Sequence, residues 1–167
     1  NKFEHESLQR GYEAAASEAI KTAHETIDNK SPSEMTDDEM KKVIGAYVAA
    51  DTAVGELDDG RAKKTELQAK LAELKKTVEE IESKYAQKVI ESIWDDLKNG
   101  TLDKTKLEAL KKTLDDLKDY IPDSLKESYD QVVDAVQAAI DAIDLVNEAS
   151  ALIKRLQEEI KNGNVSE

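Results

Sequence analysis

The sequence lacks cysteine altogether, which excludes disulfide bonds, thiolate nucleophiles and cysteine-ligated metal sites. Proline is scarce, with 2 residues in 167, and the 6 glycines are scattered, so there is no Gly-rich phosphate loop or nucleophile elbow. Aromatic residues make up 4% of the chain and charged residues 37%. Such a composition can indicate disorder, but the apolar residues recur at helical spacing, which favours folded helices.

The formal net charge of −13 argues against two classes of partner. Nucleic-acid binding needs a basic surface that displaces counterions from phosphates, and anionic membrane surfaces attract basic segments. No apolar run approaches the roughly 20 residues of a membrane helix, so we expect no direct membrane insertion by this segment. Residue 1 is Asn and no signal peptide follows it, so we expect a processed or trimmed chain.

A regular apolar stripe is the clearest pattern in the chain. Its members alternate in steps of four and three, the spacing of a coiled-coil seam: Leu67, Leu71, Leu74, Val78, Ile81 and Tyr85. Similar stripes occupy most of the remaining sequence, and no strand pattern is found. We therefore predict an all-α fold, an elongated antiparallel helical bundle with coiled-coil-like packing, made of a long helical hairpin and an N-terminal helix.

Local signals divide this bundle into helices. We expect one domain over residues 1–167, with helices at about 2–28, 36–98, 104–119 and 123–161. Pro32 ends the first helix, Thr36 and Glu39 form a capping box at the start of the second, and Gly100 suits its C-terminal cap. Pro122 indicates either a kink or a second turn.

The Asp58-Asp59-Gly60 segment is ambiguous. An Asp-Gly pair usually indicates a turn. However, acids precede Gly60 and basic residues follow it, which is the reverse of the charge order preferred at helix ends. We therefore expect a continuous helix through Gly60 with a local shift of the seam, and a turn is the alternative.

Candidate catalytic and metal-binding residues are few. The two histidines, His5 and His24, have no Glu three residues before them, so the helical Glu-x-x-His metal motif is missing. Acid pairs such as Asp95-Asp96 lie on predicted solvent faces, where their pKa values would not be pushed apart. We expect a non-enzymatic protein without metal or cofactor.

Three residues stand out as candidate sites of modification or contact. Trp94, the only tryptophan, either packs in the core or forms an exposed anchor for a partner. Asn99 and Asn164 each begin an Asn-x-Ser/Thr glycosylation sequence outside the predicted helices. These two sequences favour an extracellular location.

Two Ala- and Glu-rich segments, Tyr12–Ala19 and Asp134–Ala139, resemble the helices of parasite coat proteins. The family that they resemble is the glutamate/alanine-rich surface protein of trypanosomes. This resemblance implies a lipid-anchored coat molecule with an extended helical bundle like that of variant surface glycoproteins. The chain departs from many trypanosome surface proteins in having no cysteine, and it shows no terminal anchor signal. The surface proteins of Gram-positive bacteria have a similar helical pattern.

Three classes of function fit these observations. The first is a non-catalytic coat or stalk protein at a cell surface, membrane-anchored in its full-length form, and this is the function we predict. The second is a surface adhesin or host-factor-binding module of a pathogen, which requires an exposed apolar patch at Trp94 or along an incompletely covered seam. The third is an amphipathic lipid carrier, but long regular heptads favour a rigid bundle. The partners expected are a host protein or a second copy of the chain.

Overall fold

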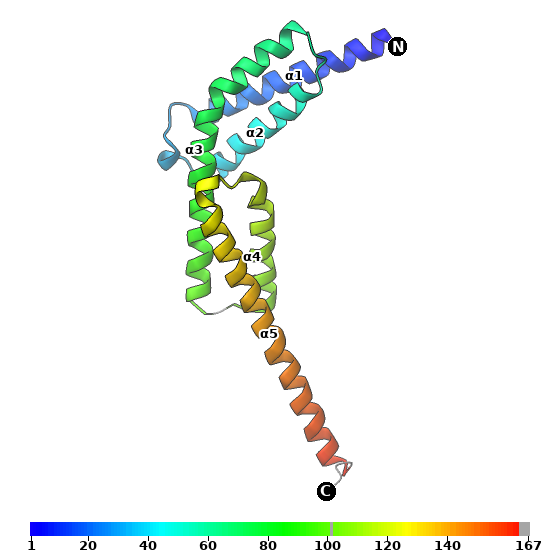
Figure 1. Cartoon of the computed structure of the whole chain (residues 1–167), viewed down its shortest axis with the longest axis vertical. Coiled ribbons are helices and arrows are strands. Elements are labelled where there is room, and N and C mark those ends of the chain that lie inside the picture. Colours follow the sequence, from blue (N-terminus) through cyan, green and yellow to red (C-terminus); the bar gives the residue numbers. More distant parts are fainter. Residues whose placement is uncertain (101, 164–167) are drawn as a thin grey trace. The chain divides into compact units, whose positions relative to one another are not determined.

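A computed structural model describes residues 1–100 and 102–163 of the chain (Figure 1). Within these residues it contains no β-strand, and its α-helices are α1 (Lys2–Ile27), α2 (Asp37–Gly55), α3 (Ala62–Lys98), α4 (Lys104–Leu117) and α5 (Lys126–Lys161). Short 3₁₀ turns lie between them at Pro32–Glu34, Lys118–Tyr120 and Asp123–Leu125. The predicted all-α helical bundle is confirmed.

The chain forms two compact units, Asn1–Lys88 and Val89–Glu167, where we expected one domain. The boundary between them falls inside α3, so this helix contributes its first part to unit 1 and its last turns to unit 2. Each unit has a hydrophobic core of its own.

Unit 1 packs three helical segments around small and aliphatic side chains. Ala16 of α1 and Ala50 of α2 are completely buried, so these helices approach closely, and α1 packs against α2 along its length. Leu67 and Leu71, which begin the predicted seam of α3, complete this core. The side chains of Thr36 and Glu39 form the predicted capping box at the start of α2.

The prediction of one continuous helix over residues 36–98 was wrong. Helix α2 ends at Gly55 and α3 begins at Ala62, and between them Gly60 has a φ of +88°. This left-handed conformation is unfavourable for residues with a Cβ atom, and it turns the chain sharply. The alternative that we considered for the Asp-Gly pair is therefore the observed one.

Side chains of α1 stabilise this turn, which explains why the order of charges around Gly60 was misleading. Arg61 forms ion pairs with Glu6 at 2.8 Å and with Glu13 at 3.0 Å. The amide of Gln9, only 3% exposed, donates to the carbonyl of Glu56 and accepts from the backbone N–H of Asp58. The backbone groups of Glu56 and Asp58 therefore find their partners on α1. Lys64 of α3 binds the carbonyl of Leu57 and the carboxylate of Asp59.

Unit 2 packs the last turns of α3 against α4 and α5. Its core contains Ile93 of α3, Leu107 and Leu114 of α4, and Val132 and Val136 of α5. The chain turns around Pro122, so that the hydroxyl of Tyr129 in α5 donates a hydrogen bond of 2.7 Å to the carbonyl of Leu114 in α4. Of the two alternatives at this proline, the turn is the correct one.

Candidate interaction surface

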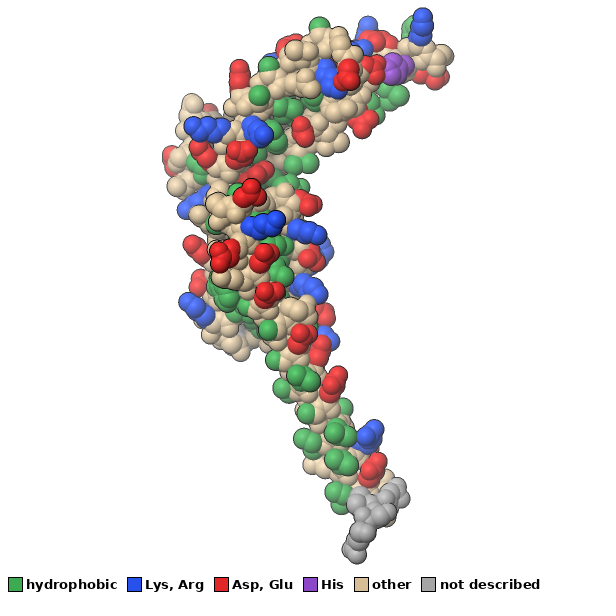
Figure 2. All heavy atoms as spheres, viewed as in Figure 1, with side chains coloured by type: hydrophobic (Ala, Val, Ile, Leu, Met, Phe, Trp, Pro, Cys, Tyr) green, Lys and Arg blue, Asp and Glu red, His purple; other side chains and the backbone are tan. Residues whose placement is uncertain are grey.

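The C-terminal part of α5 lies outside the core of unit 2. Ile143 is the last residue of this helix to pack against the core, and every described residue from Leu145 to Gly163 is exposed. Six of these are large aliphatic residues, which we call the distal face: Leu145 (66% exposed), Val146 (63%), Leu152 (47%), Ile153 (56%), Leu156 (45%) and Ile160 (65%). Figure 2 shows hydrophobic side chains following one another along this part of α5.

The distal face is uncovered because α5 is much longer than its neighbour. Helix α5 has 36 residues and α4 has 14. At 1.5 Å per residue, the two helices are about 54 and 21 Å long, so α4 cannot cover the C-terminal turns of α5. Our predicted helices at 104–119 and 123–161 already differed in length, which indicated that part of the longer helix would extend beyond the shorter one but not which of its turns would be uncovered.

The distal face is continuous along the helix. With 100° per residue, its six side chains fall within an arc of about 120°. The side chains that pack into unit 2, such as Val132, Val136 and Ile140, are centred about 140° away on the same helix. One side of α5 therefore belongs to its own core, and a different side presents the distal face to solvent.

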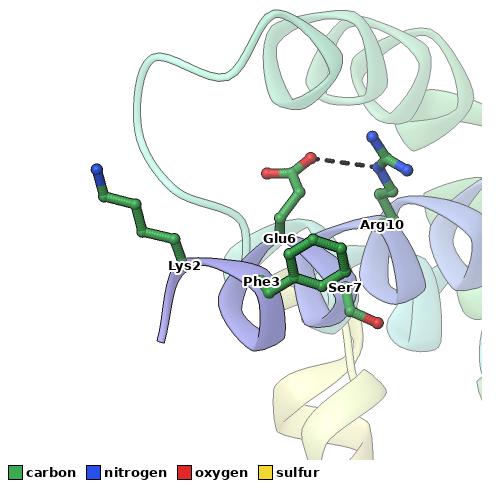
Figure 3. Close-up of a pocket in the computed structure, with 5 residues that line it drawn as sticks. All are labelled: Lys2, Phe3, Glu6, Ser7 and Arg10. Carbon is green, nitrogen blue, oxygen red and sulfur yellow. Dashed lines mark hydrogen bonds and ion pairs between the residues drawn. The ribbon is translucent and has the colours of Figure 1, made fainter.

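A smaller apolar surface occurs at the start of α1. Phe3 is 88% exposed and Leu8 is 58% exposed. A depression of about 360 Å³ beside Phe3 is also lined by Lys2, Glu6, Ser7 and Arg10, and the ion pair between Glu6 and Arg10 lies at its edge (Figure 3). All of the lining residues belong to the first turns of one helix, so no second element encloses a ligand there.

Two carboxylates in unit 1 are held in ionised form by ion pairs. A hydrogen bond from Arg61 is the main reason why the pKa of Glu6 is lowered to about 2. The pKa of Glu39 is also lowered to about 2, first by Lys30 and then by the backbone N–H of Thr36. Both groups connect different segments of unit 1, so their role in the structure is to stabilise it.

A half-buried carboxyl group, Glu82, behaves in the opposite way. Burial raises its pKa, and the nearby charge of Glu79 adds to the effect. Tyr47 lies in the same region, and its pKa is raised by burial and by the charges of Asp51, Glu79 and Glu82. Burial and, to a smaller extent, the neighbouring acids therefore both favour the neutral forms of these groups.

The histidines and acid pairs do not converge. His5 interacts with Asp58 at the Gly60 turn, and His24 is exposed in the last turn of α1. The carboxylates of Asp95 and Asp96 are also exposed. In the part of the chain that the structure describes, no group of three or more acidic or histidine side chains could hold a metal ion.

The structure places the remaining candidate residues as follows. Trp94 is partly buried and packs against the core of unit 2, so its role as an anchor for a partner stays a prediction. Asn99 is exposed just after the end of α3, where a glycan would be accessible. Thr101, the third residue of its glycosylation sequence, and Asn164 lie outside the described residues.

Comparisons with family models, curated proteins and solved structures found no match for this chain. Among the described helices, none has the combination of length and apolar character that a membrane span requires. The distal face of α5 is consequently the feature of the described chain that most directly suggests a function.

Proposed function

We propose that this protein is a non-catalytic coat or stalk protein of a cell surface, which contacts neighbouring chains through the distal face of α5. The observation that carries this proposal is the exposure of six large aliphatic side chains on one side of a single helix. Contiguous apolar patches on soluble proteins usually indicate interaction sites.

The rest of the molecule fits a crowded surface layer. The net charge of −13 keeps the protein soluble outside its contact sites. Its helical units are stabilised by packed aliphatic side chains and need no disulfide bonds, since the chain has 0 cysteines. The exposed position of Asn99 is compatible with a glycan that projects into solvent.

The distal face also favours a second candidate function, a module that captures another protein. The sequence predicted that such a module would have an incompletely covered seam, and the distal face is a surface of this kind. The two functions differ in the occupant of the face. In a coat the occupant is a neighbouring coat chain, and in a capture module it is a different protein.

Labelling of intact cells tests the location that the proposal requires. Antibodies raised against residues 1–167 should label unpermeabilised cells that express the natural protein, and external protease should remove the label. An antibody against a cytoplasmic protein serves as the control for intact membranes. Labelling that appears only after permeabilisation would contradict the proposal.

A further inference from the structure

We propose that the distal face of α5 packs against the distal face of a second copy of this chain, with the two helices parallel. This inference rests on the proposed function and deepens it, because it identifies the neighbouring chain and the way it binds. The product is a two-stranded coiled coil formed by the C-terminal turns of α5.

The apolar content of the distal face suits a helical partner. Most of the stability of a helix in a protein comes from packing its apolar stripe against another element. Six aliphatic side chains, each about half exposed, provide an interface on the order of 600 Å² per partner, at the lower end for specific complexes. We therefore expect a dissociation constant in the micromolar range.

The charge of this segment favours a second copy over a highly charged partner. Residues 145–161 contain three acidic side chains, Glu148, Glu158 and Glu159, and three basic ones, Lys154, Arg155 and Lys161. The segment is thus formally neutral in a chain with a net charge of −13. Two copies can meet here without the repulsion that opposes contact between other parts of their surfaces.

The distribution of these charges predicts a parallel arrangement. On the helical wheel, Lys154 and Lys161 lie beyond one edge of the distal face. Glu148, Glu159 and Arg155 lie beyond the other edge, which therefore has a formal net charge of −1. In parallel pairs, opposite edges of the two helices meet, whereas in antiparallel pairs identical edges meet. The parallel pair places the lysine edge of each helix next to the net acidic edge of the other, and the antiparallel pair places the two lysine edges next to each other.

The rest of unit 2 leaves room for this partner. The side of α5 that packs against α3 and α4 is centred about 140° away from the distal face. A partner helix can therefore bind the distal face while α3 and α4 stay packed against α5 in both copies.

Sedimentation equilibrium of the 167-residue chain tests the interface. Ile153 is central in the distal face and 56% exposed, so Ile153→Glu should leave the core of unit 2 intact while placing two carboxylates opposite each other. We expect this change to raise the dimer dissociation constant roughly 100-fold. Ala151→Glu is the matched control: it adds the same charge on the opposite side of the helix and should change the constant less than about threefold.

Single cysteines test the orientation, since the chain has 0 cysteines of its own. In a parallel pair, Val146 faces Val146 and Ile160 faces Ile160. Oxidised Val146→Cys and Ile160→Cys should therefore each form disulfide-linked dimers when incubated separately. In an antiparallel pair, only a mixture of the two variants would cross-link efficiently.

Several outcomes would overturn the proposal. These are a monomer at all concentrations, a dimer that Ile153→Glu does not weaken, a trimer or larger species, and cross-linking restricted to the mixture. A monomer would leave a different protein as the occupant of the distal face. Cell-surface labelling does not depend on self-association, so failure of this proposal and failure of the proposed location are distinguishable.

Discussion

Some charged residues in this protein form ion pairs that connect helices distant in sequence. Arg61 follows the Gly60 turn and pairs with Glu6 and Glu13 of α1. The guanidinium and the carboxylate of Glu13 are each about one-fifth exposed, so the pair is less screened than a fully solvated one. Such a pair stabilises the folded state only while its acids are ionised.

We predict that Arg61→Gln lowers the stability of the protein in a pH-dependent manner. Because the pKa of Glu6 is lowered to about 2 in the folded state, this ion pair stabilises the fold above the usual carboxyl pKa of 4.5. Its contribution is lost as the pH falls through about 2. Urea unfolding should therefore show that the free energy of unfolding of Arg61→Gln is lower than that of wild type. This difference should be at its full value at pH 7 and should disappear as the pH falls from 4.5 to 2.

Arg155→Gln is the matched control for this measurement, because it removes the same charge from an exposed position of α5. Its unfolding midpoint should stay close to that of wild type at every pH. A difference for Arg61→Gln that is independent of pH would show that packing of the side chain matters and that its ion pairs do not.

At the scale of elements, two glycines illustrate how local backbone geometry determines where helices begin and end. Gly60 lies in the turn between α2 and α3 with φ of +88°, whereas Gly45 lies inside α2. Beyond the adjacent backbone, no atom lies within 4 Å of the position that a Cβ would occupy at either glycine. The effect of adding a methyl group at either position is therefore conformational and not steric.

We predict opposite effects for the same substitution at these two positions. Gly60→Ala should destabilise the protein by about 1–2 kcal/mol, because alanine is strained at positive φ. Gly45→Ala should stabilise it by about 1 kcal/mol, because alanine is the better helix former. Thermal and urea unfolding of both variants would check these values. Equal effects of the two substitutions would contradict the structural difference between the two sites.

These elements also show what could be predicted from the sequence. The capping box of Thr36 and Glu39 and the break at Pro32 are local signals, and the helix ends that they predict agree with the structure. The turn at Gly60 was missed because the residues that stabilise it, Glu6, Gln9 and Glu13, lie far away on α1. Spacing within the chain does not reveal such long-range partners.

The candidate surface was predictable only in part. The apolar periodicity of α5 was visible in the sequence as far as Ile160, but periodicity does not indicate which turns a neighbouring helix covers. That information depends on where α4 begins and ends and on how it packs against α5. Trp94, for which the sequence left core packing and contact with a partner as alternatives, packs against the core of unit 2.

At the scale of the whole molecule, two helical units with separate cores leave one long apolar face uncovered. The units are organised around aliphatic side chains, and the described chain does not gather its acids and histidines into a metal site. The apolar residues of the distal face differ from those of the two cores because they are exposed to solvent. The account depends on a second chain covering them.

Hydrogen–deuterium exchange at different protein concentrations tests this claim most directly, because it reports protection segment by segment. Between about 1 and 500 μM, amide exchange in residues 145–160 should become markedly slower as dimers form. Exchange around Ala16 and Ile20, in the core of unit 1, should not change. Exchange in residues 145–160 that is equally fast at both concentrations would contradict the account.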